Sequence, residues 1–368
     1  MTQEVLDQPI KETVLYNVHV ELGAKLVPFG GYTMPVSYPE GIQAEYFSVR
    51  KEAGLFDVSH MGEFFISGDG AEEFLQRMTI NDVSKLQEGY AQYSAMCYPD
   101  GGIIDDLILY RKPDGYFIVV NASNIQKDFE WLMQNVINEV NLENLSDTFS
   151  LIALQGPQSR KILSKLTNVN LKMPFYSYED GIVCGYSVMV SRTGYTGELG
   201  FEIYGDKNSI ISIWNELVNA GAKPAGLAAR DILRMEMKYC LYGNDIDDTT
   251  NPIEAGLSWV IALDKEEFIG KDAILEVKVN GQSRQLIAFI MEERGIPRQG
   301  YEIFIDSKKV GVVTSGTQSP ILKTGIGLAY VDRPFHKLGQ GIFIHIRNKF
   351  IPARIIKPPF IKETSLYH

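Results

Sequence analysis

The segment that decides the fold is Gly101-Gly102-Ile103-Ile104-Asp105-Asp106-Leu107-Ile108-Leu109-Tyr110. It follows the turn sequence Pro99-Asp100-Gly101-Gly102, which separates it from a second run of strand-forming residues, Tyr93–Tyr98. A glycine-rich turn between two such runs predicts a β-hairpin. Two adjacent carboxylates lie near the start of the second strand, and a carboxylate on a buried face costs free energy unless it is hydrogen-bonded or used in function. The pair is therefore the first candidate for chemistry.

Side chains alternate across a strand, so the two aspartates face opposite sides of the sheet. The residues expected on the face of Asp106 are Ile104, Ile108 and Tyr110, and those expected on the face of Asp105 are Ile103, Leu107 and Leu109. Because its face is otherwise aliphatic, we predict that Asp105 accepts hydrogen bonds from amides of the turn. We predict that Asp106, which shares its face with a tyrosine, lies on the wall of a ligand site. In the alternative interpretation, both carboxylates only stabilise the turn.

Outside this hairpin, the sequence predicts short helices and strands up to about residue 280. Helices are predicted over residues 40–53, 71–79, 123–138, 207–219 and 228–241, and further strands over residues 55–67, 116–121, 150–154, 183–191 and 201–204. Asn121 or Ser123 is the expected cap of the helix over residues 123–138. Beyond residue 280, β-rich runs alternate with glycine turns, which is typical of a small barrel or sandwich. The expected fold class is α+β, in about three domains.

The composition narrows the classes of function. The chain has 368 residues, with 35 Lys plus Arg against 46 Asp plus Glu and a formal net charge of −11. An acidic protein lacks the basic face that displaces counterions from nucleic acid, so we expect no nucleic-acid partner. Three cysteines, far apart in the sequence, predict neither a disulfide framework nor a zinc knuckle. No stretch reaches the roughly 18 apolar residues that cross a bilayer, and no secretory signal is recognisable. We therefore expect a cytoplasmic protein with no membrane partner.

Two further segments combine glycine with polar side chains. The run Thr193–Gly200 contains three glycines besides its threonines and precedes Glu202, whose two carboxylate oxygens suit the adjacent N–H donors of a pterin or guanine edge. Small residues precede Arg230 at a helix start, where backbone donors and a guanidinium suit an anion or a heterocycle. In the alternative interpretation, Glu202 is solvated and Arg230 belongs to surface ion pairs. Motifs of phosphate-binding loops, dinucleotide-binding folds and zinc or serine hydrolases are missing, and we expect no metal.

The order and spacing of these segments resemble the T-protein (aminomethyltransferase) family of the glycine cleavage system, within the folate-binding T-protein superfamily. Each motif alone is weak, but their order along the chain, from about Tyr16 to Phe360, is highly specific. The segments that carry the resemblance are Leu55–Glu63, Gly101–Leu107, Val120–Ala122, Leu154–Pro157, Ser191–Glu198, Ala228–Asp231, Leu241–Asp245 and Thr314–Gly316. Tyr32 stands where the family usually has tryptophan, and Leu199 where it usually has aspartate.

The resemblance implies a three-domain cloverleaf around a central channel that holds tetrahydrofolate. The implied domains are a folate-binding α+β domain over residues 1–55 and 145–280, a second α+β domain with the catalytic aspartate over residues 56–144, and a C-terminal β-barrel over residues 281–368. The implied reaction belongs to glycine degradation. It transfers the methylene of the aminomethyl group on the lipoyl arm of H-protein to tetrahydrofolate, and it gives 5,10-methylenetetrahydrofolate and ammonia.

The resemblance also assigns residues. The family's catalytic aspartate matches Asp106, in agreement with the facing argument. The folate-lining positions carry over to Tyr93, Ile108, Tyr110, Val119, Asn121, Tyr195, Glu202, Arg230, Tyr239 and Trp259. Nothing is carried over to the stretch Phe360–Tyr367, which aligns poorly. Tetrahydrofolate is expected as the acceptor substrate, lipoylated H-protein as the partner, and no metal.

Two alternatives stay open. The first is a tetrahydrofolate-dependent demethylase of the same superfamily, with another one-carbon donor. The second is a non-enzymatic folate-binding scaffold or repair factor, which would not require Asp106.

Overall fold

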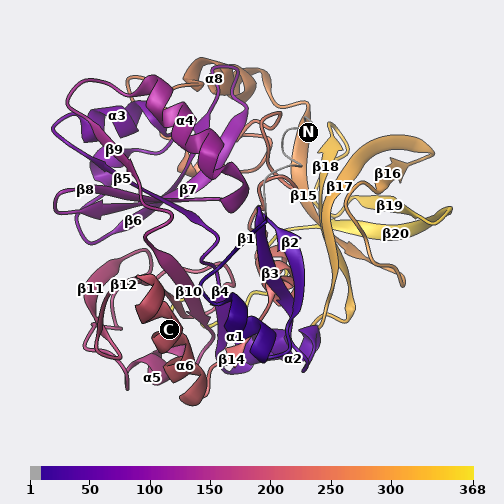
Figure 1. Cartoon of the computed structure of the whole chain (residues 1–368). Coiled ribbons are helices and arrows are strands. Elements are labelled where there is room, and N and C mark those ends of the chain that lie inside the picture. The colour runs from indigo at the N-terminus through magenta and orange to yellow at the C-terminus, as the bar shows by residue number, and fades with distance from the viewer. Residues whose placement is uncertain (1–9) are drawn as a thin grey trace.

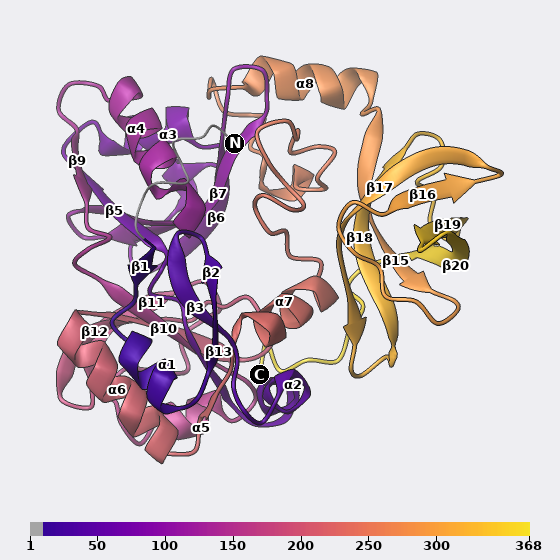
Figure 2. The ribbon, with the colours of Figure 1, turned by 45° about the vertical axis from the view of Figure 1, so that its right-hand side comes forward.

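The computed structural model describes residues 10–368 and contains three bodies around a common centre (Figure 1). Two lobes of helices and strands lie one above the other, and a closed β-barrel stands beside them. The view turned by 45° shows the three bodies arranged around the middle of the molecule (Figure 2). The predicted α+β class and the C-terminal barrel are confirmed. The predicted first segment, residues 1–55, is described from residue 10 onward.

The first lobe is built on a six-stranded sheet. Its strands, in spatial order, are β11 (Tyr178–Val183), β12 (Tyr186–Ser191), β13 (Gly200–Gly205), β10 (Ser150–Gln155), β4 (Gly54–Asp57) and β14 (Lys223–Pro224). One face packs against α6 (Lys207–Asn219), with α1 (Tyr16–Glu21) and α5 (Ser159–Leu163) nearby. Helix α6 has the bounds that the sequence predicts, because Asp206 caps it by accepting hydrogen bonds from the backbone N–H groups of Asn208 and Ser209 at 2.8 and 2.9 Å.

The second lobe is built on a five-stranded sheet covered by two helices. Its strands, in spatial order, are β6 (Ala91–Cys97), β7 (Ile103–Lys112), β8 (Gly115–Val120), β5 (Gly62–Ser67) and β9 (Asn141–Asn144). Helices α3 (Ala71–Met78) and α4 (Ile125–Asn135) bury their apolar sides on one face. The hairpin predicted around residues 99–102 is confirmed as β6–β7. The single strand predicted over residues 55–67 is wrong, since β4 and β5 belong to different sheets and Asp57 ends β4 by accepting a hydrogen bond from the Ser59 N–H at 2.9 Å.

The start of α4 also differs from the prediction. A short 3₁₀ turn, η3 (Ala122–Asn124), precedes the helix, and neither Asn121 nor Ser123 caps it through its side chain. The Asn121 amide instead donates to Asp105 and Asp106, both at 2.8 Å. A residue that could have capped the helix is therefore committed to the aspartate pair.

The barrel closes the C-terminal part of the chain. Its strands, in spatial order, are β15 (Arg284–Met291), β18 (Thr324–Asp332), β17 (Lys308–Ser319), β16 (Glu302–Ile305), β19 (Gly341–Ile346) and β20 (Lys349–Ile356). Fully buried side chains such as Phe289, Val331 and Ile344 form the apolar core of the barrel. Between the barrel and the second lobe run η4 (Ser258–Val260) and α8 (Lys271–Asn280), which share one apolar core with both.

The remaining elements lie outside the three sheets described above or join them. They are β1 (Lys11–Glu12), the hairpin β2 (Lys25–Phe29) and β3 (Tyr32–Ser37), α2 (Ile42–Lys51), η2 (Val83–Lys85) and α7 (Leu227–Glu236). Helix α7 is shorter than the predicted residues 228–241, because the chain turns at Lys238, which has a positive φ of 61°. Among the described residues, no helix has both the length and the apolar character needed to span a bilayer.

Candidate active site

A cavity of about 1220 Å³ lies between the two lobes. The β2–β3 hairpin, α7 and the segment after the barrel complete its walls. Every predicted site residue except Tyr110 lines it. These residues are Tyr93, Asp106, Ile108, Val119, Asn121, Tyr195, Glu202, Arg230, Tyr239 and Trp259. The cavity therefore brings together side chains that are as far as 166 positions apart in the sequence, from Tyr93 to Trp259.

Strand β7 carries Asp106 to the cavity wall. The predicted alternation holds from Asp105 onward: Asp106 and Ile108 face the cavity, whereas Leu107 and Leu109 belong to the core under α3 and α4, although Leu107 also borders the cavity. It fails before that point, because Ile104 also lies in this core. The cause is a break in the β6–β7 pairing. Met96 pairs with Asp105 and Cys97 pairs with Ile103, so Ile104 is an extra residue with no partner on β6.

Two neighbours hold the Asp106 carboxylate in place. The Tyr93 hydroxyl donates to Oδ2 at 2.9 Å, and the Asn121 amide donates to Oδ1 at 2.8 Å. Burial, and then the negative charge of Asp105, raises the pKa of Asp106 to about 7. A carboxyl group with a pKa in this range can both take up and release a proton near neutral pH. The arrangement suits a group that exchanges or balances charge on a bound molecule.

Asp105 does not contact the turn, which corrects the prediction. Its carboxylate accepts hydrogen bonds from the Asn121 backbone N–H at 2.9 Å and from the side-chain amides of Asn121 and Asn124 at 2.8 and 2.6 Å. The turn is stabilised instead by Asp100, which accepts a hydrogen bond from the Gly102 N–H at 3.0 Å. Asp105 thus connects the start of α4 with the strand that carries Asp106.

Glu202 faces the cavity from the other lobe. It is 8% exposed, and burial raises the pKa of its carboxyl group although a hydrogen bond from Thr193 and the charge of Arg230 oppose that shift. The Thr193 hydroxyl that donates to Glu202 is itself hydrogen-bonded to Ser191 at 2.8 Å. The segment Thr193–Gly200 therefore holds the Glu202 carboxylate through the hydroxyl of Thr193.

Tyr110 lies behind the cavity wall, not on it. It is fully buried, and its hydroxyl is hydrogen-bonded to Thr193 at 3.3 Å and to the hydroxyl of Tyr204 at 3.1 Å. Tyr204 stands between Tyr110 and the cavity. Tyr110 is thus outside the cavity lining, and it contacts Thr193, the residue that donates to Glu202.

Arg230 reaches the cavity from the first turns of α7. Its guanidinium lies 4.4 Å from the ring centroid of Tyr195, which stacks on Tyr239 at 5.7 Å. Burial lowers the pKa of this guanidinium, which is partly exposed and lines the cavity. The helix begins close to β3 because Gly226 lacks a side chain: a Cβ there would lie 2.5 Å from the Val36 backbone. A partly buried guanidinium that faces a cavity is suited to an acceptor on a ligand.

Trp259 marks one rim of the cavity. It is 73% exposed, and its ring stacks on that of Tyr93 with 5.9 Å between centroids and 14° between planes. An exposed indole held by a second aromatic ring offers a flat apolar surface to a ring on a ligand.

Sequence reasoning missed two parts of the wall. His60 is buried, lines the cavity and has no hydrogen-bond partner for Nδ1 among residues 10–368. Burial, and then the charge of Arg230, lowers the pKa of His60 to about 4, so the imidazole is neutral. The segment after the barrel contributes Pro358, Pro359 and Tyr367. No local signal identifies these last residues, because only the return of the chain across the first lobe brings them to the cavity.

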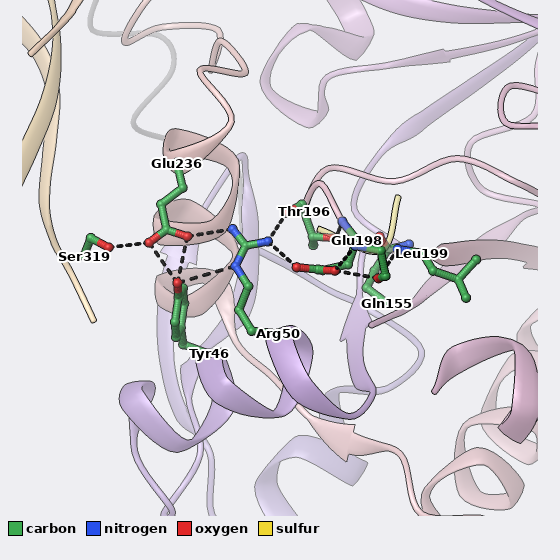
Figure 3. Close-up of polar contacts among 9 residues, drawn as sticks. Tyr46, Arg50, Gln155, Thr196, Glu198, Leu199, Glu236 and Ser319 are labelled. Atoms are coloured by element: carbon green, nitrogen blue, oxygen red, sulfur yellow. Dashed lines mark hydrogen bonds and ion pairs between the residues drawn. The ribbon is translucent and has the colours of Figure 1, made fainter. Parts of the chain in front are cut away.

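Buried ion pairs around Arg50 help to hold the segment after the barrel against the first lobe (Figure 3). Arg50 on α2 donates to Glu198 at 2.8 Å and to Glu236 on α7 at 2.6 Å. Ser319 on β17 donates to the same Glu236 at 2.6 Å, and the Ser365 N–H donates to Glu198 at 2.8 Å. One arginine thus links the first lobe, the barrel and the final segment.

Within the described residues, no group of three or more His, Cys, Asp or Glu side chains is arranged to hold a metal ion.

The chain is similar to known proteins along nearly its whole length. The family described as the GCVT N-terminal domain matches residues 15–265, and the glycine cleavage T-protein C-terminal barrel domain matches residues 284–362. The aminomethyltransferase of Halothermothrix orenii is 49% identical over 358 residues, which cover 96% of this chain and 100% of that protein. The aminomethyltransferase of Flavobacterium psychrophilum is 50% identical over 362 residues, with 96% of this chain and 100% of that protein covered.

A solved structure has the same fold. The crystal structure of glycine cleavage system aminomethyltransferase T from Bartonella henselae matches with a TM-score of 0.91 and 34% sequence identity. The match covers 96% of this chain and 99% of that chain. The similarity therefore includes both lobes and the barrel.

Proposed function

This chain belongs to the glycine cleavage T-protein family and is an aminomethyltransferase, and we propose that its central cavity binds tetrahydrofolate beside Asp106. The proposed donor is the aminomethyl group carried on the lipoyl arm of H-protein. The bond between nitrogen and the methylene carbon breaks and nitrogen leaves as ammonia. The bond from that carbon to the lipoyl sulfur also breaks, and two bonds from the carbon to folate nitrogens form. The two folate N–H protons are released, one completing ammonia and the other leaving the lipoyl sulfur as a thiol.

The chemistry of the cavity supports folate as the acceptor. The reduced pterin of tetrahydrofolate presents adjacent N–H donors and ring acceptors, and tetrahydrofolate would supply the two nitrogens that take up the methylene group, one in the pterin ring and one beside it. Glu202 faces the cavity with its carboxylate, and Arg230 faces it with its guanidinium beside the ring of Tyr195. Both groups are costly to bury alone, and a pterin edge would satisfy both. We assign them to fixing the ring.

The observation that carries this proposal is that Asp106 faces the same cavity as Glu202 and Arg230. We assign to Asp106 the acceptance of a proton, or the stabilisation of positive charge, as ammonia leaves. Tyr93 and Asn121 would keep the carboxylate aimed at the reacting atoms through their hydrogen bonds. Holding both substrates in one cavity removes much of the entropic barrier to their reaction.

The test is an assay with the whole protein, lipoylated H-protein loaded with the aminomethyl group, and tetrahydrofolate. We expect release of ammonia with formation of 5,10-methylenetetrahydrofolate. Asp106→Asn should lower turnover by about 10² or more, the usual effect of removing a charge-stabilising group, while the Kd for tetrahydrofolate changes little. Asp264→Asn, which changes a carboxylate whose side chain is 76% exposed, is the matched control.

Other outcomes would overturn the proposal. A demethylase with another one-carbon donor would release no ammonia from aminomethylated H-protein. A folate-binding scaffold would bind tetrahydrofolate without any turnover. Near-normal turnover in Asp106→Asn would remove this residue from the mechanism.

A further inference from the structure

A second carboxyl group is buried directly behind the aspartate pair. Asp128 lies on α4 with no exposed surface. Within residues 10–368, no N–H or hydroxyl group donates to either of its carboxyl oxygens. It lies one helical turn after Asn124, whose side-chain amide donates to the Asp105 carboxylate at 2.6 Å, so the two carboxyl groups face the same small region. Two buried carboxyl groups this close cannot both be ionised without a large cost, so we infer that one of them holds a proton and hydrogen-bonds the other.

The contacts of the two residues indicate which one holds the proton. Asp105 accepts three N–H hydrogen bonds, from the Asn121 backbone and from the amides of Asn121 and Asn124. These bonds favour the charged form of Asp105. Asp128 accepts none from the described residues, and burial, followed by the charge of Asp105, raises its pKa well above the ordinary value. Asp128 is therefore the protonated partner.

The other titratable groups around Asp128 do not change this assignment. Lys127, the adjacent residue on α4, directs its ammonium group to the Ile104 carbonyl at 2.6 Å and to the Tyr242 hydroxyl at 2.9 Å. Its charge opposes the shift in the pKa of Asp128 without reversing it, and the charge of Asp106 adds to the shift. Tyr98 and Tyr242 also face this group, and burial raises the pKa of both, so they remain neutral phenols.

The hydrogen bonds continue from this pair to the cavity. The Asn121 amide nitrogen donates to Asp105 and to Asp106, at 2.8 Å in each case. An amide group has two N–H bonds, and here both are directed at the aspartate pair. If Asp105 moves or becomes neutral, the Asn121 amide loses the partner that fixes its orientation. The position of Asp106 therefore depends on how Asp105 is held.

We propose that Asp128 is a positioning residue for aminomethyl transfer: its carboxyl proton holds the Asp105 carboxylate, and through Asn121 it fixes the orientation of Asp106. The inference deepens the proposed function and rests on it for its kinetic part. A protonated Asp128 also limits the negative charge behind Asp106 to that of Asp105 alone. With a second negative charge there, the ionised form of Asp106 would be disfavoured at neutral pH.

Two variants of similar size separate this role from simple packing. In Asp128→Asn the amide can donate to Asp105 as the protonated acid does, so kcat should stay within about threefold of the unchanged protein and the pH profile should not move. In Asp128→Leu no donor remains, and kcat should fall about tenfold or more while the KM for tetrahydrofolate changes less than threefold. Glu130→Gln, an exposed change on the same helix, is the control.

Three kinetic results would overturn the proposal. Equal kcat values for Asp128→Asn and Asp128→Leu would leave packing as the only role. A loss confined to KM would place Asp128 in binding instead of positioning. A shift of the acidic limb of the Asp128→Asn profile to lower pH would mean that the substitution removed a negative charge, and that Asp128 is ionised in the unchanged protein.

A spectroscopic test stands even if Asp128→Leu does not fold. The infrared difference spectrum between the unchanged protein and Asp128→Asn at pH 7 should contain the carbonyl stretch of one protonated carboxyl group, which shifts in D₂O. Absence of this band would refute the assignment. The measurement needs no turnover, so its failure is distinct from failure of the proposed function, which is read from ammonia release by the unchanged protein.

Discussion

The hydroxyl of Tyr93 donates a 2.9 Å hydrogen bond to the Asp106 carboxylate, while its ring stacks on Trp259 at the cavity rim. One side chain thus touches both the residue assigned to chemistry and an exposed aromatic surface. This geometry links the protonation of Asp106 to the packing of the rim, and the first prediction depends on it.

Replacement of Tyr93 by phenylalanine should move the acidic limb of the activity profile to higher pH. The hydrogen bond from Tyr93 lowers the pKa of Asp106, which burial and Asp105 together raise to about 7. Without that bond the pKa rises further, and an acid that acts in its charged form then needs a higher pH. We expect the acidic limb of kcat against pH to shift by roughly one to two units, corresponding to a lost hydrogen bond to a charged group. Tyr186→Phe, at an exposed site, is the control, and an unmoved limb would contradict the prediction.

Replacement of Glu202 by alanine should weaken tetrahydrofolate binding without removing the chemical step. The carboxylate is the cavity group best suited to paired N–H donors. We expect the Kd to rise about tenfold or more, which corresponds to about 1.4 kcal/mol of binding free energy. Titration calorimetry with Glu216→Ala as the exposed control would measure it. An unchanged Kd would argue against contact between Glu202 and the pterin.

Replacement of Tyr110 by phenylalanine should affect stability more than binding. Its hydroxyl contacts Thr193 and Tyr204 behind the cavity wall, and it does not line the cavity. Loss of these hydrogen bonds should lower the free energy of unfolding by about 1 kcal/mol and change the Kd for tetrahydrofolate less than threefold. Urea unfolding and calorimetry on the same samples separate the two effects. A tenfold rise in Kd would return Tyr110 to the folate-binding residues.

Replacement of Glu63 by glutamine should flatten the pH dependence of stability. Glu63 on β5 is buried, no donor among residues 10–368 reaches its carboxyl oxygens, and burial raises its pKa well above the ordinary value. The folded chain therefore keeps this proton above pH 4.5, where the unfolded chain releases it, and stability falls as pH rises. The loss is about 1.4 kcal/mol for each pH unit until the folded pKa is reached.

The measurement for Glu63→Gln is the free energy of unfolding at pH 5, 6 and 7. The unchanged protein should lose stability across this range more steeply than the variant. Parallel curves for the two proteins would show that Glu63 is already ionised in the folded chain.

The sequence predicts those features that depend on neighbouring residues. The β6–β7 hairpin follows from one turn, α6 follows from its period and its Asp206 cap, and the orientation of Asp106 follows from strand alternation. The partners of Asp105 could not be predicted in this way. Asn121 and Asn124 are 16 and 19 residues away, and they reach Asp105 only because α4 folds back over the sheet.

Strand alternation also has a limit that Tyr110 illustrates. It assigns Tyr110 to the same face as Asp106, and both do face the first lobe. Alternation cannot indicate where the cavity ends along that face, because the boundary is set by Tyr204 and Thr193 from the other lobe. The place of Tyr367 in the cavity wall could not be predicted either. It depends on the hydrogen bond from the Ser365 N–H to Glu198, a residue 167 positions earlier in the chain.

The place of Pro358 and Tyr367 in the cavity wall has a consequence for synthesis on the ribosome. Both follow β20, the last strand of the barrel, so they leave the exit tunnel after every other part of the wall. A nascent chain that has already formed both lobes still has an incomplete cavity. Full affinity for the small-molecule substrate should therefore be acquired late in translation, after the barrel has emerged and the final segment has docked on the first lobe.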